Sequence, residues 1–237
     1  MVDLSRRQLI VSGLGLVAAG CSGSRLVTTP RPGPLWPTSQ VRPHIDGRAV
    51  TMLPNEAAAK AVGPIMAYPR ARWAKARPIQ RRLRAMGRIQ RITIHHEGWT
   101  PVWFNDLAST SRRLESIRTS HLKRLQAGDI GYHLIIDRAG QIWQGRDLQY
   151  QGAHVRDQNT NNVGVMVLGN FDLQRPTDLQ LTTLHQTVTR LMHQYDIPVN
   201  QVFTHQEFNI TSCPGKALQG KLVAMRRSGE LNSTRTI

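Results

Sequence analysis

Apolar positions downstream of residue 68 follow two spacings, which predict strands interleaved with helices. Alternating or β-branched apolar stretches predict strands over 91–95, 132–137, 141–145, 163–168 and 202–204. A spacing of three to four residues predicts helices over 106–126 and 177–195, and Pro214 can open a last helix that runs to about residue 227. This order predicts a single α/β domain in which helices cover a central sheet.

The amino terminus has the layout of an export signal. Arg6 and Arg7 precede an apolar run over 9–19, which is too short to span a bilayer permanently, and small residues follow. The four residues that end at Cys21, AAGC, resemble a lipobox, which implies that Cys21 becomes the lipidated first residue. The arginine pair resembles a twin-arginine signal or is an ordinary basic n-region. We therefore expect an extracytoplasmic protein of the cell envelope, anchored to a membrane by lipid.

Four segments follow from these patterns. Residues 1–20 are assigned to a signal peptide. Residues 21–67 are rich in Pro, Ser and Thr in their first part, and we assign them to an extended tether and an irregular segment. Residues 68–227 form the predicted domain, and 228–237 form a C-terminal tail.

The charge of the chain indicates a polyanionic partner. The sequence has 31 Lys and Arg residues against 15 Asp and Glu, a net charge of +16. Aromatic residues are only 5%, and no zinc-finger, RNP or helix-turn-helix signature is present, so we expect no nucleic-acid partner. Anionic envelope polymers fit better. The basic run over 70–91 contains nine Lys and Arg residues and no acid, and it is part of such a surface or simply a solvated face.

Three candidate metal ligands stand out by position. His95 ends the first predicted strand of the domain, His205 follows the last one, and Cys213 lies eight residues further on. Two imidazoles and a thiolate suit zinc, and three protein ligands leave a fourth position for water, as in catalytic sites. By spacing alone the pattern is weak, because the chain has nine histidines and a strand-end histidine is often a hydrogen-bonded surface group.

A series of short motifs resembles the type 2 N-acetylmuramoyl-L-alanine amidases and peptidoglycan recognition proteins over roughly residues 68–224. In chain order the motifs are GDIGYH at 128–133, GR at 145–146, GAH at 152–154, VGV at 163–165, GNF at 169–171 and CPG at 213–215. The resemblance implies a central mixed β-sheet flanked by helices and a monomer that acts on peptidoglycan or muropeptides. The implied reaction is zinc-dependent hydrolysis of the amide between N-acetylmuramic acid and L-alanine.

The resemblance also implies the zinc ligands, which fall on His95, His205 and Cys213. Family members that only bind peptidoglycan typically lack the cysteine, so its presence favours an amidase over a non-catalytic binding module of the same fold. Tyr132 matches the tyrosine that donates to the developing oxyanion, with a packed core tyrosine as the alternative.

Two further positions follow from the resemblance. Thr211 lies two residues before the cysteine, where the family carries Lys or Thr near the reacting oxygen. His154, in the GAH motif, is expected in the cleft in contact with the muropeptide, with a histidine buried for structure as the alternative.

Glu97 departs from the family pattern. It follows the histidine pair at a position where the family usually has Thr or Ser. Strand alternation aims its side chain to the same side as His95. Three roles stay open: the general base, a group that orients a ligand or contacts a cationic peptide side chain, and an outward surface carboxylate.

Overall fold

The structure is a computed structural model that describes residues 33–34, 44–45, 48–49 and 65–232. The predicted signal peptide, Cys21 and most of the tether lie outside the described residues. Short antiparallel pairs join β1 (Gly33–Pro34) to β4 (Met66–Ala67) and β2 (His44–Ile45) to β3 (Arg48–Ala49). Among the helices of the described part, none is long and apolar enough to cross a membrane.

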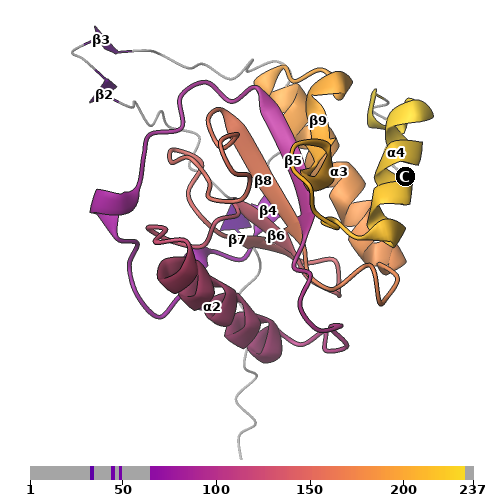
Figure 1. Cartoon of the computed structure of the whole chain (residues 1–237), viewed down its shortest axis with the longest axis horizontal. Coiled ribbons are helices and arrows are strands. Elements are labelled where there is room, and N and C mark those ends of the chain that lie inside the picture. The colour runs from indigo at the N-terminus through magenta and orange to yellow at the C-terminus, as the bar shows by residue number, and fades with distance from the viewer. Residues whose placement is uncertain (1–32, 35–43, 46–47, 50–64, 233–237) are drawn as a thin grey trace, which may run out of the picture. The chain divides into compact units, whose positions relative to one another are not determined.

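A mixed five-stranded sheet forms the centre of the domain, as predicted (Figure 1). The β6–β7 pair is antiparallel, and the other neighbouring strands are parallel. In sheet order the strands are β7 (Ile142–Gln144), β6 (Leu134–Ile136), β8 (Asn162–Val167), β5 (Arg91–His96) and β9 (Val202–Thr204).

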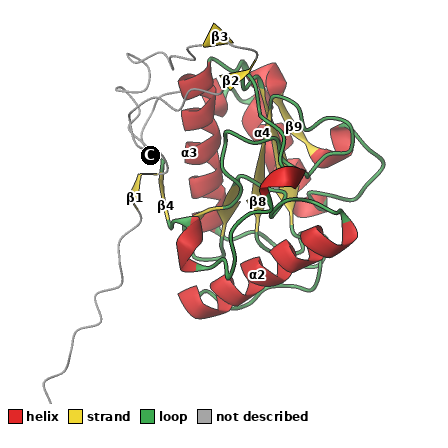
Figure 2. Ribbon diagram, turned by 90° about the vertical axis from the view of Figure 1, so that its left-hand side faces the viewer, coloured by secondary structure: helices red, strands yellow, loops and turns green. Residues whose placement is uncertain are grey.

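Helices cover both faces of the sheet (Figures 1 and 2). On one face, α3 (Asp178–Tyr195) and α4 (Lys216–Arg227) pack with the sheet in the larger apolar cluster. On the other face, α2 (Leu107–Arg124) contributes Leu114 and Ile117 to a second cluster. Local capping defines the starts of two of these helices. The Asp106 side chain accepts from the Ser109 N–H at α2, and a capping box opens α3.

Strand alternation decides which histidine of the pair after Ile94 faces the candidate site. Ile92 and Ile94 belong to the cluster that includes α3 and α4. His95 therefore faces the α2 side, and it pairs in register with Met166 of the second cluster. His96 is turned toward the opposite face, where its Nδ1 accepts from the N–H of Phe171 (3.2 Å).

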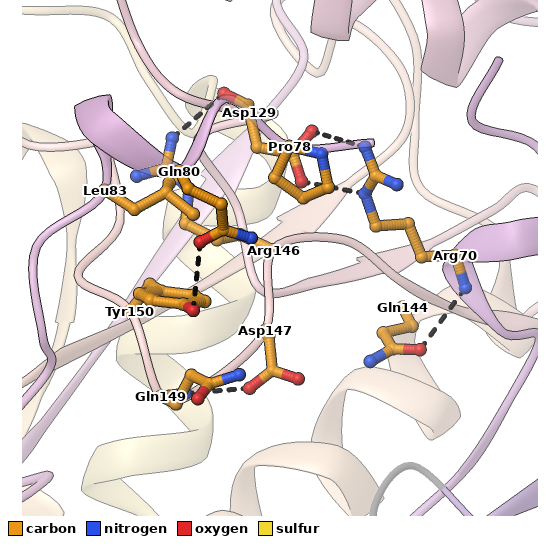
Figure 3. Close-up of a pocket in the computed structure, with 10 residues that line it drawn as sticks. All are labelled: Arg70, Pro78, Gln80, Leu83, Asp129, Gln144, Arg146, Asp147, Gln149 and Tyr150. Carbon is orange, nitrogen blue, oxygen red and sulfur yellow. Dashed lines mark hydrogen bonds and ion pairs between the residues drawn. The ribbon is translucent and has the colours of Figure 1, made fainter. Parts of the chain in front are cut away.

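The segment before β5 is fixed to the domain by a buried carboxylate. Asp129 pairs with Arg70 at 2.7 Å and with Arg118 of α2 at 3.0 Å. Asp129 and Arg146 both line a pocket of about 200 Å³, whose lining residues are drawn in Figure 3. Six of the nine cations in the basic run are exposed, and only Arg70 takes part in an ion pair among the described residues, so the run lies mostly at the surface.

Several helix and domain boundaries in the structure differ from the predicted ones. Pro214 is not the first residue of α4, so that prediction is wrong: the Cys213–Pro214 peptide is cis and Gly215, at φ +84°, is the N-cap. The helix α2 ends at Arg124, two residues before the predicted end at residue 126. Part of the predicted tail belongs to the fold, because a 3-10 turn over Glu230–Asn232 places Leu231 in the core.

Candidate functional site

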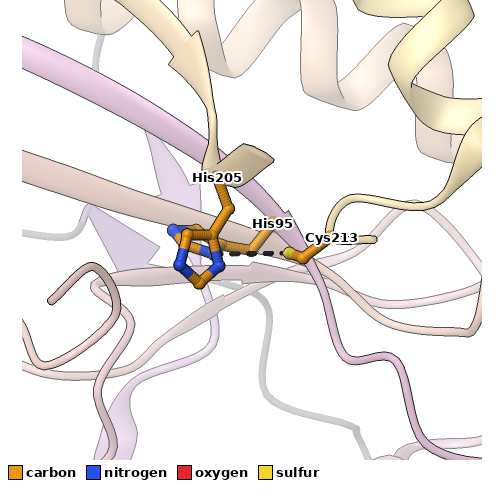
Figure 4. A group of neighbouring side chains, drawn as sticks. All are labelled: His95, His205 and Cys213. Carbon is orange, nitrogen blue, oxygen red and sulfur yellow. Dashed lines mark hydrogen bonds between the residues drawn. The ribbon is translucent and has the colours of Figure 1, made fainter. Parts of the chain in front are cut away.

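The structure brings His95, His205 and Cys213 together. One ligand atom from each residue can be chosen so that all of these atoms lie within 4.8 Å of one another (Figure 4). The Nδ1 of His95 and the Sγ of Cys213 lie 3.6 Å apart. His95 and Cys213 are buried and His205 is partly exposed, so the group opens to solvent on the His205 side.

Sheet topology explains this convergence. The strands β5 and β9 are parallel neighbours, so His95 near the end of one and His205 just after the other lie at the same edge of the sheet. The loop that carries Cys213 is tied back to that edge, because the Gln206 N–H donates to the Cys213 carbonyl (2.9 Å).

The donor set fits a zinc ion. Ligands at about 2.1 Å for nitrogen and 2.3 Å for sulfur in tetrahedral geometry lie about 3.6 Å apart, and the His95 and Cys213 atoms are separated by 3.6 Å. Burial lowers the pKa of His95 well below its ordinary value and also lowers that of His205, so both imidazoles keep a lone pair for a cation. Burial raises the pKa of the Cys213 thiol to about 12, and a bound metal would be needed to hold it as thiolate.

Tyr132 lies beside these ligands. Its ring centroid is 5.2 Å from that of His95, and burial, with smaller effects of Cys213 and Glu97, raises the pKa of its phenol above the ordinary value. The hydroxyl therefore stays protonated and can donate. Thr211 is also close: its hydroxyl oxygen accepts from the Cys213 N–H (3.2 Å), which leaves its own hydrogen free to donate elsewhere.

His121 of α2 was not singled out by sequence reasoning. Its Nδ1 accepts from the N–H of Gly131 (2.8 Å), the residue before Tyr132, and its ring lies 5.4 Å from the Tyr132 ring. The only sequence signal for it was its place on the apolar stripe of the predicted helix. The helix thus supports the loop that carries Tyr132.

His154 lies behind His95. His154 is only 7% exposed, and its Nδ1 is 3.0 Å from Nε2 of His95. Its Nε2 is 3.2 Å from the Asn162 carbonyl oxygen. Both ring nitrogens therefore have protein partners, as in the buried alternative, and a contact with the muropeptide stays a prediction.

Glu97 is not an outward surface carboxylate. Its side chain is 1% exposed, and its Oε1 lies 2.5 Å from Nε of Arg113 on α2. The Arg113 guanidinium in turn lies over the ring of Trp99, 5.1 Å from its centroid. Burial raises the pKa of Glu97 to about 7, although Arg113 opposes the shift. The two inward roles, as a base and as an orienting or contacting group, remain.

We expect Glu97→Gln to keep zinc and to lower turnover by about 10² to 10⁴-fold, as loss of a general base does. A base must be ionised, so wild-type activity should fall as pH decreases through about 7, and this acidic limb should change in the variant. If Glu97 instead orients a ligand, zinc affinity should fall by about 10 to 100-fold while zinc-saturated turnover survives. The measurements are zinc affinity and zinc-saturated rate against pH on one preparation.

The matched control is Glu115→Gln. Glu115 also pairs with an arginine of α2, at 2.9 Å from Arg118, but it is not among the groups that shift the pKa of Tyr132. It should leave affinity and rate unchanged. Wild-type values for both quantities in Glu97→Gln would remove this residue from the site.

The sequence is similar to those of known amidases and peptidoglycan recognition proteins. The family model described as N-acetylmuramoyl-L-alanine amidase matches residues 85–216. Human N-acetylmuramoyl-L-alanine amidase is 27% identical over 154 residues, which are 64% of this chain and 27% of that protein. Peptidoglycan-recognition protein 2 of Holotrichia diomphalia is 37% identical over 93 residues, 39% of this chain and 49% of that protein. The chain therefore spans between about a quarter and a half of these two relatives.

The fold is also known from solved structures. Drosophila PGRP-LB matches with a TM-score of 0.60 and 22% identity, over 67% of this chain and 92% of that one. This likeness concerns the fold. Because the family model matches more than half of the sequence, the chain belongs to the N-acetylmuramoyl-L-alanine amidase family.

Proposed function

We propose that the protein is a zinc-dependent amidase that hydrolyses the bond between N-acetylmuramic acid and L-alanine in peptidoglycan. The family includes amidases and peptidoglycan recognition proteins, so membership alone does not distinguish cleavage from binding. The observation that carries the proposal is the complete ligand set, His95, His205 and Cys213, with Tyr132 beside it. Two imidazoles and one thiolate leave a zinc ion with net positive charge and a free coordination position.

The surrounding residues have separable tasks in this reaction. Zinc bound by the three ligands would acidify a water molecule and polarise the scissile carbonyl. Tyr132, protonated across the working pH range, donates to the carbonyl oxygen as negative charge develops on it. Thr211 offers a second, uncharged donor on the Cys213 side. Glu97 supplies a carboxylate whose pKa of about 7 suits proton transfer near neutral pH.

Product analysis tests the proposed function. Purified full chain with one equivalent of zinc is incubated with peptidoglycan and with soluble muropeptides, and the products are identified by mass spectrometry. Free stem peptides that begin with L-alanine, together with glycan that has intact lactyl groups, are expected. Binding to peptidoglycan without release of peptides would identify a recognition module instead.

We also propose that the enzyme acts outside the cytoplasm, attached to a membrane through lipid on Cys21. The AAGC sequence after an apolar run supports this proposal. Cys21→Ser should release the protein from the membrane fraction and leave its specific activity unchanged, because the anchor determines location and not chemistry. Fractionation and assay of both forms make the comparison, and equal membrane attachment of variant and wild type would contradict lipidation.

A further inference from the structure

A line of hydrogen bonds runs from the backbone to the far side of His95. His95 turns its Nδ1 toward the Cys213 sulfur, at 3.6 Å, and its Nε2 toward Nδ1 of His154, at 3.0 Å. His154 turns its other nitrogen, Nε2, toward the carbonyl oxygen of Asn162 on β8, at 3.2 Å. Two imidazoles therefore connect a backbone carbonyl to the candidate metal centre.

The Asn162 carbonyl at the end of this line determines which ring nitrogen of His154 and of His95 carries the hydrogen. A carbonyl oxygen only accepts, so His154 carries its hydrogen on Nε2 and keeps a lone pair on Nδ1. That lone pair accepts from Nε2–H of His95. A neutral His95 with its hydrogen on Nε2 has its lone pair on Nδ1, the nitrogen that faces Cys213.

Two glycines make room for the His154 ring. A Cβ on Gly152 would lie 2.2 Å from Cδ2 of that ring, and a Cβ on Gly164 would lie 2.6 Å from the same atom. Both distances are shorter than side chains tolerate. The backbone N–H of His154 is held as well, by the side-chain oxygen of Asn159 (2.9 Å). The glycines of the GAH and VGV motifs therefore both leave space for the His154 ring to pack against the His95 ring.

We propose that His154 is a positioning residue that selects the tautomer of His95 and aims its Nδ1 at the metal. The inference rests on the proposed zinc function, and it gives His154 a task that needs no contact with substrate. Ligand histidines in metalloproteins commonly donate their second N–H to a carboxylate or a carbonyl. Here a second imidazole stands between the ligand and the carbonyl.

The wild-type protein allows a direct test. In the zinc-loaded full chain labelled with ¹⁵N-histidine, NMR should show a directly bonded hydrogen on Nε2 of both His95 and His154, and a metal-bound Nδ1 on His95. A hydrogen on Nδ1 of either residue would overturn the proposal. If the wild type binds no zinc, both the proposed function and the proposed role of His154 are wrong.

Substitutions separate positioning from packing. His154→Leu removes the acceptor, and we expect its Zn²⁺ affinity, measured by competition with a chelator, to fall by about 10 to 100-fold. His154→Gln offers an amide oxygen to the Nε2–H of His95 and should recover most of the affinity. Thermal unfolding of the metal-free proteins checks that each variant folds.

The matched control is His133→Leu. His133 is also fully buried and its ring lies 5.8 Å from that of His154, but its nitrogens pair with the Gly164 N–H and the Tyr150 carbonyl. It should keep wild-type zinc affinity. Equal losses in His133→Leu and His154→Leu would show a packing effect and overturn the proposal, as would wild-type affinity in folded His154→Leu.

Discussion

Cys213→Ser is expected to remove zinc and amidase activity together. The thiolate is the only anionic member of the ligand set, and a serine hydroxyl is a poor zinc ligand at neutral pH. Two imidazoles alone would hold the ion weakly. We expect less than about 0.1 zinc per chain after dialysis and no detectable peptide release. Metal analysis and the product assay on the same preparation provide the measurement.

Cys21→Ser is the matched control, because these are the only two cysteines in the sequence. Cys21→Ser also replaces a sulfur by an oxygen, but at the position that we assign to the lipid anchor. This variant should retain one zinc per chain and full turnover. A Cys213→Ser protein that loses zinc but still cleaves peptidoglycan at the wild-type rate would contradict the proposed mechanism.

Tyr132→Phe is expected to lower turnover by about 10²-fold or more while zinc content and fold are kept, as loss of an oxyanion donor does. The substitution removes one hydroxyl and preserves the ring that packs beside His95. Because the donor acts on charge that develops during the reaction, the loss should fall mainly on kcat, with little change in KM.

Tyr150→Phe provides the comparison. The Tyr150 hydroxyl donates to Gln80 (3.1 Å) at the pocket of Figure 3, whose lining includes none of the three ligands. Its turnover should equal that of the wild type. Full turnover in Tyr132→Phe would instead assign Tyr132 to packing, the alternative that its sequence left open.

Elements with a regular apolar period could be predicted from the sequence. The strand over 91–95 and the helix over 177–195 agree with β5 and α3 to within one residue at each end. The start of α4 could not be predicted, since it depends on the backbone angle of Gly215 and not on periodicity. The burial of Leu231 likewise depends on contacts with elements distant in the chain.

The candidate ligands could be predicted because strand ends and the family motifs mark them. The partners of the other site residues could not. His154 contacts His95 from 59 positions further along the sequence. Arg113 pairs with Glu97 from helix α2, and the sequence pattern shows only that Arg113 lies outside the apolar stripe of that helix. Such pairings are set by how strands and helices pack, and a linear pattern does not contain that information.

The large sequence separation within the ligand set has a consequence for biosynthesis. His95 and Cys213 are 118 positions apart, on strand β5 and just before the last α-helix, α4. A chain that has been synthesised only as far as His205, just after the last strand, therefore has both histidines but lacks the thiol. Binding of the proposed zinc would close a very long loop, and its binding energy would become available only to the finished domain. Hydrolytic activity would then start when folding ends, and an incomplete chain would be inactive toward the wall.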